Sequence, residues 1–195
     1  MDFIKKLFCF LGICVIISNG FSEPSAIPVV CDQEYALCTS ARCIPLPGSS
    51  DDAICDCVVE KGKSVGFTSC DQRKPGEDKY KAASIVSTFS FEQFSTKRPI
   101  NCSQGMPWTN CVDMPCTVDP QNKKRALCKC KIDNTQAFFT FGGDCDISTC
   151  ATGFWSGSTP ETAAILRKAL MQATGLKSMT TPAVCGVQSS EKDSQ

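Results

Sequence analysis

Histidine is absent from this chain of 195 residues. Its absence excludes Ser-His-Asp and Cys-His catalysis, HExxH zinc proteases and every zinc site with an imidazole ligand. The side chain that most often transfers protons near neutral pH is therefore missing. An enzyme built from this sequence would have to use carboxylates, lysine, tyrosine or thiols, and no spacing singles out a catalytic residue.

Long apolar runs are missing after the first twenty residues. The run at 7–17 follows two lysines and is too short to span a bilayer, which needs about 20 residues. Small and polar residues come next, so the sequence predicts a signal peptide over residues 1–20, cleaved after Gly20 or Ser22. We expect a secreted or periplasmic protein with no membrane insertion after cleavage. The alternative is a retained anchor or a lipid-modified cysteine.

The chain also has little net charge. Cleavage would remove Asp2, Lys5 and Lys6 and change the net charge from +0 to −1. Such a chain has no overall field that would steer nucleic acid or an anionic membrane towards it. We therefore expect no nucleic-acid partner.

Cysteine, in contrast, is abundant: there are 16, of which Cys9 and Cys14 leave with the signal peptide. An even number remains, and export delivers the chain to an oxidising compartment where disulfides persist. Structural zinc sites usually pair cysteines roughly two to four residues apart, and CxxC does not occur here, so we expect no metal and no other cofactor. The cysteines expected to form disulfides are Cys31, Cys38, Cys43, Cys55, Cys57, Cys70, Cys102, Cys111, Cys116, Cys128, Cys130, Cys145, Cys150 and Cys185.

The cysteine spacing repeats once along the chain. The pattern C-x4-C-x11-C-x-C begins at Cys38 and again at Cys111, an offset of 73 residues. A proline and an alanine between these cysteines are identical at the same offset. The sequence therefore predicts two copies of one cysteine-rich module, at 31–70 and 102–150.

Each module is predicted to be a β-hairpin crossed by disulfides. Turn sequences at 45–48 and 119–122 precede β-prone stretches that contain the CxC pairs. Second turns are expected at 61–62 and 133–134, each followed by another β-prone run. The predicted fold class is a small disulfide-rich α+β protein, mainly β, with two tandem cysteine-rich β-hairpin modules and one C-terminal helix.

The two cysteines of each CxC pair are too far apart along a strand to bond each other. Residues i and i+2 lie roughly 6.6 Å apart on one face, whereas bonded half-cystines place their β-carbons about 3.8 Å apart. Cys128 and Cys130 are therefore expected to bond two different neighbouring segments. Among the remaining cysteines, Cys150 is expected to pair with Cys185.

Other segments are predicted from their local sequence. Residues 71–101 are expected to form a polar linker followed by a strand at 85–94. A helix is predicted at 158–175, capped by Ser158 and packed on the sheet of the second module. Residues 186–195 are expected to be a disordered tail.

The two CxC stretches carry opposite charges. Residues 51–60 include four acidic side chains, whereas residues 123–131 include five basic ones. Three interpretations are open: two solvated faces, an acidic strand packed on a basic strand, or a basic strand that binds an anion.

Aromatic loop sequences and the basic stretch supply candidates for a binding surface. Aromatic residues and arginine are enriched in interfaces, and a basic triplet would suit a trypsin-like protease. The alternative for the aromatic residues is that they fill the core. The candidate binding residues are Trp108, Phe154, Trp155, Lys123, Lys124 and Arg125.

The sequence favours a non-enzymatic binding protein, because small cross-linked modules commonly present loops to a partner. The partner is expected to be a protein or a glycan, and the oligomeric state is left open. One alternative is a secreted enzyme that uses a carboxylate pair, or thiol–disulfide exchange at a strained Cys55–Cys57 or Cys128–Cys130 bond. The other is an envelope-associated structural protein.

If the acidic strand packs on the basic strand, replacing Lys124 and Lys129 together by Glu should lower the stability. Opposed charges across strands contribute about 0.2–1 kcal/mol per pair, so a loss of that order is expected for each pair that is broken. Denaturant unfolding at low and high salt measures the loss. Unchanged stability with unchanged salt dependence would contradict the packing.

Overall fold

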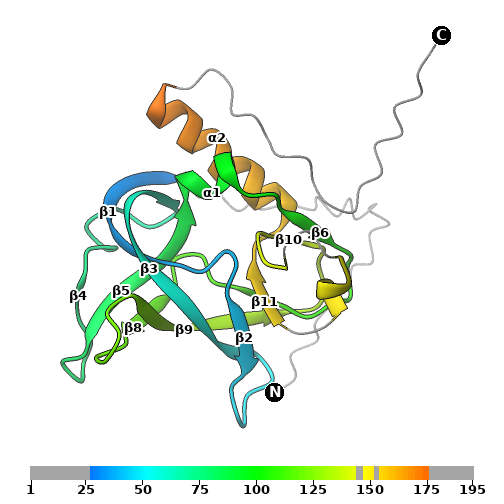
Figure 1. The fold of residues 1–195 in the computed structure, drawn as a ribbon, viewed down its shortest axis with the longest axis horizontal. Helices are drawn as coiled ribbons and strands as arrows, with labels where there is room; N and C mark the ends of the chain where they lie inside the picture. Colours follow the sequence, from blue (N-terminus) through cyan, green and yellow to red (C-terminus); the bar gives the residue numbers. More distant parts are fainter. Residues whose placement is uncertain (1–26, 144–146, 152–153, 176–195) are drawn as a thin grey trace, which may run out of the picture.

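The computed structural model describes residues 27–143, 147–151 and 154–175. Within these residues the fold is mainly β, with a long C-terminal helix (Figure 1). This confirms the predicted disulfide-rich, mainly β class, because six disulfides join the described segments. The predicted signal peptide at 1–20, Cys145, Cys185 and the predicted tail at 186–195 lie outside the described residues.

Along the described part of the chain, strands alternate with a short α-helix, a 3-10 helix and a longer C-terminal α-helix. They are β1 (Val29–Leu37), β2 (Arg42–Pro45), β3 (Asp52–Gly66), β4 (Gly76–Glu77), β5 (Ala83–Ser90), α1 (Phe91–Thr96), β6 (Ile100–Cys102), β7 (Trp108–Asn110), β8 (Pro115–Val118), β9 (Arg125–Asp133), β10 (Phe138–Thr140), the 3-10 helix η1 (Ile147–Ala151), β11 (Phe154–Gly157) and α2 (Pro160–Thr174).

Strands β3 and β9 form the centre of a nine-stranded sheet. They pair antiparallel, and the register is symmetric about Cys55 and Cys128, which occupy equivalent positions in the two copies of the repeat. Each strand is also the second strand of a hairpin, β2–β3 or β8–β9. β1 pairs with β3 as β7 pairs with β9, so the two copies are related by an approximate twofold.

The repeat extends beyond the predicted modules, because β5 and β11 make equivalent pairings after each of them, and each of these last strands crosses over to the other copy. β5 runs parallel to β1 and antiparallel to β8 of the second copy. Equivalently, β11 runs parallel to β7 and antiparallel to β2 of the first copy. α1 follows β5 and α2 follows β11. The copies are thus interleaved in one sheet, because this exchange pairs edges of β2 and β8 that would otherwise be open. The predicted separate tandem modules are not confirmed.

Two buried serines at equivalent positions hold the exchanged strands in place. The hydroxyl of Ser87 on β5 donates to the carbonyl of Cys111 in the second copy. The hydroxyl of Ser156 on β11 donates to the carbonyl of Cys38 in the first copy and accepts from the Ala41 N–H at 2.9 Å. Each hydroxyl therefore pairs backbone groups of the opposite copy that would be buried without partners.

The predicted second hairpin is wrong in both copies. β3 continues through the predicted turn at 61–62 because β1 pairs with residues 58–66 of β3, on both sides of that turn. Gly62 has φ of 140° within the strand, a conformation that costs glycine little. In the second copy, β10 follows the turn region at 133–134 but pairs with β6 instead of β9.

Adjacent cysteines of the CxC pairs bond different segments, as predicted. Cys128 bonds Cys116 on β8, and Cys130 bonds Cys111 in the connection after β7. The first copy has the equivalent pair of bonds. The six disulfides are Cys31–Cys70, Cys38–Cys57, Cys43–Cys55, Cys102–Cys150, Cys111–Cys130 and Cys116–Cys128.

The predicted pairing of Cys150 with Cys185 is wrong, because Cys150 bonds Cys102. η1 packs beside β6, and both cysteines are buried in a small cluster with Trp108 and Phe138. The spacing of the cysteines could not predict this pairing, because it depends on η1 packing against β6, and the two cysteines are 48 residues apart in the sequence.

The four disulfides of β3 and β9 form the main core, which we call the sulfur cluster. The Sγ atoms of Cys38 and Cys128 lie 3.2 Å apart, and those of Cys55 and Cys111 lie 3.4 Å apart. Each contact joins a disulfide of one copy to a disulfide of the other. Sulfur therefore takes the place of large apolar side chains between the copies.

Helix α2 begins and packs differently from the prediction. Its N-cap is Thr159, whose hydroxyl accepts from the Thr162 N–H at 3.1 Å. Ser158 cannot cap, because its backbone pairs with that of Phe139. Gly175 ends the helix with φ of 69°, a left-handed conformation that glycine commonly adopts after the last turn of a helix.

The buried face of α2 covers strands of the first copy more than those of the second. Ala163, Leu166 and Leu170 join Val65 of β3 and Phe89 of β5 in a second core cluster. The helix contacts β1, β3, β10 and α1, and Figure 1 shows α1 and α2 together above one end of the strands. The prediction that the helix packs on the sheet of the second module is therefore wrong for most of its contacts, and among the described strands of that module it is β10 that lies against the helix.

Burial in the sulfur cluster predicts an order of reduction. Under mild reductant without denaturant, Cys31–Cys70 should open first, because Cys70 is half-buried whereas Cys55, Cys57 and their counterparts are at most 1% exposed. Alkylation of the released thiols followed by peptide mass mapping measures the order. Release of the sulfur-cluster thiols before Cys70 would contradict this packing.

Candidate functional site

The four central hairpin strands present one face to the core and one to solvent. Along β3 and β9 the cysteines and alanines are buried, and the residues between them point the other way. We call the solvent side the outer sheet face. Its residues are Arg42, Ile44, Asp52, Ile54, Asp56, Val58, Pro115, Thr117, Arg125, Leu127, Lys129 and Lys131.

Ion pairs join the acidic strand to the basic strand across this face. Asp52 accepts from Lys131 at 2.6 Å and pairs with Lys129 at 3.0 Å. Asp56 accepts from the Arg125 Nε at 2.8 Å and also pairs with its Nη2. The structure therefore supports the interpretation in which the acidic strand packs on the basic strand.

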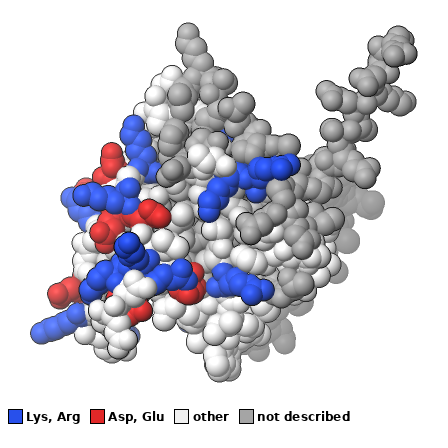
Figure 2. Space-filling model, viewed as in Figure 1, with Lys and Arg blue, Asp and Glu red and all other residues white. Residues whose placement is uncertain are grey.

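Lys123 and Lys124 take no part in the ion pairs described above. Both are exposed in the turn that leads into β9, and the Lys124 carbonyl accepts from the Val59 N–H at 2.9 Å. In Figure 2 basic and acidic side chains are interleaved at the left of the displayed face, whereas its right side shows basic side chains. Within the basic stretch at 123–131, Arg125, Lys129 and Lys131 are paired with carboxylates, so the stretch does not present the patch of one sign that a polyanion requires.

The carboxyl groups with shifted pKa values are held in the ionised form. Hydrogen bonds from Lys131 and Lys129 lower the pKa of Asp52 from 3.8 to about 2. A hydrogen bond from Lys74 lowers the pKa of Asp71. Burial raises the pKa of Asp133, but hydrogen bonds from Thr135 outweigh it, so the net shift is downward. A general acid of a carboxylate pair needs the opposite shift.

A groove of about 350 Å³ lies at one end of the outer sheet face, and we call it the Trp155 groove. The indole packs against Gly142, where a β-carbon would lie 2.2 Å from Cε3, and the Arg42 guanidinium lies 5.4 Å from its ring centroid. The groove brings together Trp155 and Arg125, two of the predicted binding residues. Its lining residues are Leu37, Ser40, Ala41, Arg42, Asp56, Val58, Arg125 and Trp155.

The other two aromatic candidates do not form a surface. Trp108 is 1% exposed and stacks on Phe138 with ring centroids 5.6 Å apart, so its assignment to a binding surface is wrong. β7, which carries Trp108, lies between β9 and β11 in the interior of the sheet. Phe154 is half-buried against the sulfur cluster. The predicted loop around Phe154 and Trp155 is strand β11.

Sequence reasoning missed the apolar part of the outer sheet face. Ile44 is 68% exposed and Leu127 is 53% exposed, and Val58 is 36% exposed. Each is directly next to a buried cysteine on its strand. The alternation around the CxC pairs could therefore have placed all three on one solvent face.

Among the residues that the structure describes, the sulfur geometry offers neither a metal site nor the predicted exchange site. Cys38, Cys116 and Cys128 place their sulfurs within 4.8 Å of one another, as do a second set of three. All six sulfurs are in disulfides, so these groups hold no thiolate to bind a metal. The strained Cys55–Cys57 and Cys128–Cys130 bonds of the exchange hypothesis are not formed.

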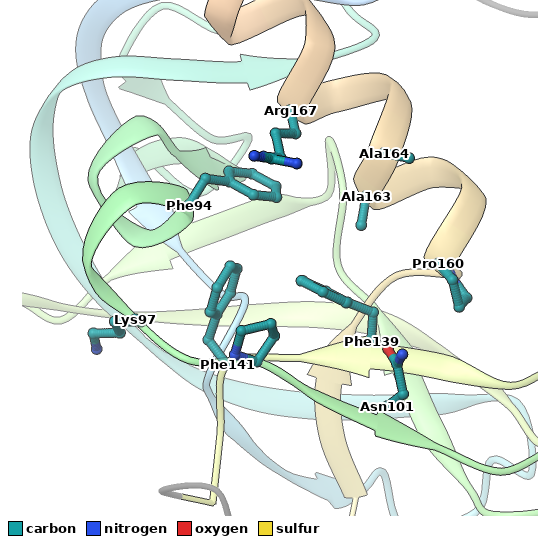
Figure 3. Close-up of a pocket in the computed structure, with 10 residues that line it drawn as sticks. Phe94, Lys97, Asn101, Phe139, Phe141, Pro160, Ala163, Ala164 and Arg167 are labelled. Atoms are coloured by element: carbon teal, nitrogen blue, oxygen red, sulfur yellow. The ribbon is translucent and has the colours of Figure 1, made fainter. Parts of the chain in front are cut away.

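A second pocket of about 210 Å³ lies on the helix side of the molecule, and we call it the phenylalanine pocket (Figure 3). The rings of Phe94, Phe139 and Phe141 form its floor, and α2 forms one wall. Its lining residues are Phe94, Lys97, Pro99, Asn101, Phe139, Phe141, Pro160, Ala163, Ala164 and Arg167.

Comparisons with protein families, curated proteins and solved structures give no match to this chain. Among the described residues, no helix has the length and apolar character needed to cross a membrane. The six disulfides indicate a protein of an oxidising, non-cytoplasmic compartment.

The pKa of Asp52 predicts how its ion pairs depend on pH. Because the folded value of about 2 lies below the ordinary 3.8, the ion pairs stabilise the fold above pH 4, and this contribution is lost as the pH falls through 2. Asp52→Asn should therefore lower the unfolding midpoint at pH 7, and the difference from the wild type should disappear near pH 2.

Denaturant unfolding at pH 2, 4 and 7 measures this difference. Glu60→Gln is the matched control, because it removes an exposed acidic charge from the same strand. Equal destabilisation by the two substitutions, or a difference for Asp52→Asn that persists at pH 2, would contradict the role given to the ion pairs.

Proposed function

We propose that this chain is an exported, non-enzymatic protein that binds a protein partner through the outer sheet face and the Trp155 groove. The observation that carries the proposal is the exposure of Ile44, Leu127 and Val58 on one face. Ile54 pairs with Ile44 on β2 and with Lys129 on β9, and Leu127 lies two residues before Lys129 on the same face. Clustered exposed apolar residues with a polar rim are typical of protein interaction sites.

The composition of the face supports a protein partner. An apolar strip of Ile44, Ile54 and Leu127 is flanked by the Asp56–Arg125 pair and leads to Trp155. Tryptophan and arginine are the residues that most often dominate binding energy at protein interfaces. The partner would present an apolar ridge to the strip, with polar groups for the arginines of the groove.

The position of Trp155 favours a protein over a glycan. A sugar ring stacks on an open aromatic face, whereas the Trp155 indole has Gly142 packed against it and Arg42 over its ring. The Trp155 edge and the arginines beside it suit side chains of a partner better than a sugar ring. A glycan remains an outcome of the test below.

The rigidity of the outer sheet face is a second observation that supports a role in binding. Ile54 and Asp56 on β3, and Leu127 and Lys129 on β9, each lie between two residues that are buried in the sulfur cluster. Disulfides on the inner side fix the strand backbone before a partner arrives. A preorganised surface pays less ordering entropy on association.

A photoreactive residue placed at position 127 of the exported chain tests this proposal. Irradiation in the native compartment should give a discrete protein adduct, and Ile44→Glu in the same chain should abolish it. A photoreactive residue at position 165 is the control, because Ile165 is 44% exposed on α2, away from the face.

Adducts at position 127 alone support the proposal, and a mass of two chains would identify the partner as a second copy. No adduct, equal adducts at both positions, or a glycan adduct at position 127 would contradict it. Ile44 is exposed, so disulfide mapping of the Ile44→Glu variant should show the native pairs.

A further inference from the structure

The phenylalanine pocket forms where the helices of the two copies meet. Phe94 comes from α1 of the first copy, whereas Phe139 and Pro160 come from β10 and α2 of the second. α1 and α2 contact each other at this point. The pocket is therefore a product of the interleaved fold, and it shares no lining residue with the outer sheet face or the Trp155 groove.

Three aromatic rings give the pocket an apolar interior. The Phe94 and Phe141 rings meet edge to face with centroids 5.4 Å apart, and Phe139 meets Phe141 in the same way at 5.2 Å. Pro99 and Ala163 add apolar wall. Ring edges and faces of this kind pack well on another aromatic ring.

The volume limits what the pocket can hold. It measures about 210 Å³, whereas an apolar cavity of about 150 Å³ binds benzene. The space therefore suits one aromatic ring with a short substituent, and it is too small for a steroid or a long acyl chain.

The mouth of the pocket is polar and cationic. Asn101, Lys97 and Ala164 are exposed at its rim, and Arg167 is half-buried. Figure 3 shows the Arg167 side chain extending from α2 to the Phe94 ring, whereas Lys97 points away from the rings. Both charged residues that line the pocket are cations.

Arg167 gives the pocket a preference for one kind of polar group. A guanidinium has five N–H donors in a planar fork, so it can bind a carboxylate through two of them and keep other contacts. A ring seated among the phenylalanines would place a carboxylate on a short linker at the Arg167 end.

We propose that the phenylalanine pocket binds a small aromatic carboxylate, with the ring among Phe94, Phe139 and Phe141 and the carboxylate on Arg167. This site is independent of the outer sheet face. The protein would then bind a small molecule on its helix side in addition to a protein partner.

Calorimetric titration of the disulfide-intact protein with 3-phenylpropionate tests this inference. Saturable binding of one ligand per chain is expected. The neutral analogue 3-phenyl-1-propanol should bind at least about tenfold more weakly, because it cannot form the charge-assisted pair of hydrogen bonds that a carboxylate forms with Arg167. Hexanoate, which has the carboxylate but no ring, should also bind more weakly.

Two substitutions locate the binding. Ala164→Trp should abolish binding of both phenyl compounds, because the exposed Ala164 lines the mouth and a large ring would fill it. Arg167→Gln should reduce the affinity for 3-phenylpropionate to that for the alcohol. Lys168→Gln is the matched control, an exposed cation at the next position of α2, and should leave both affinities unchanged.

Near-ultraviolet circular dichroism checks that each variant is folded. Failure of the wild type to bind 3-phenylpropionate, undiminished binding by Ala164→Trp, or equal effects of Arg167→Gln and Lys168→Gln would overturn the proposal. Binding of hexanoate as tight as that of 3-phenylpropionate would overturn the aromatic class.

Discussion

Pairing of β3 with β9 is the interaction on which the rest of this structure depends. It joins the two copies of the repeat at equivalent residues, Cys55 and Cys128, so one register fixes both halves. Behind the pair, four disulfides contact one another in a buried cluster. In front, the same alternation exposes Val58 of β3 and Leu127 of β9. The core and the candidate binding face are therefore two sides of one strand pair.

The exchange of strands between the two copies helps to explain how a core with few large apolar side chains can stabilise the fold. Each copy contributes its last strand to the other, and buried Ser87 and Ser156 pair the backbone groups at both crossings. The helices that follow meet over a second cluster built on Phe94 and Leu166. Disulfides supply cross-links where large apolar side chains are scarce, which is how small exported domains commonly reach stability.

Local pattern was sufficient for some of this arrangement. Cysteines two apart on a strand must bond different segments, so the directions of Cys128 and Cys130 followed from strand geometry. Opposite charges on the two CxC strands suggested their pairing. The partners of β5 and β11 could not be read in this way, because strand pairing depends on segments distant in sequence. The prediction that Trp108 lies on a binding surface was wrong for the same reason, because the strands on either side of β7 decide whether its side chains are exposed.

Nuclear Overhauser contacts across β3 and β9 test the central claim most directly. The account predicts contacts between backbone protons of Ala53 and Cys130 and between those of Cys57 and Ala126, on both sides of the Cys55 and Cys128 pair. It also predicts that they persist in the disulfide-intact chain at neutral pH. Strand contacts confined within each copy, with none between β3 and β9, would contradict the interleaved fold and remove the outer sheet face with it.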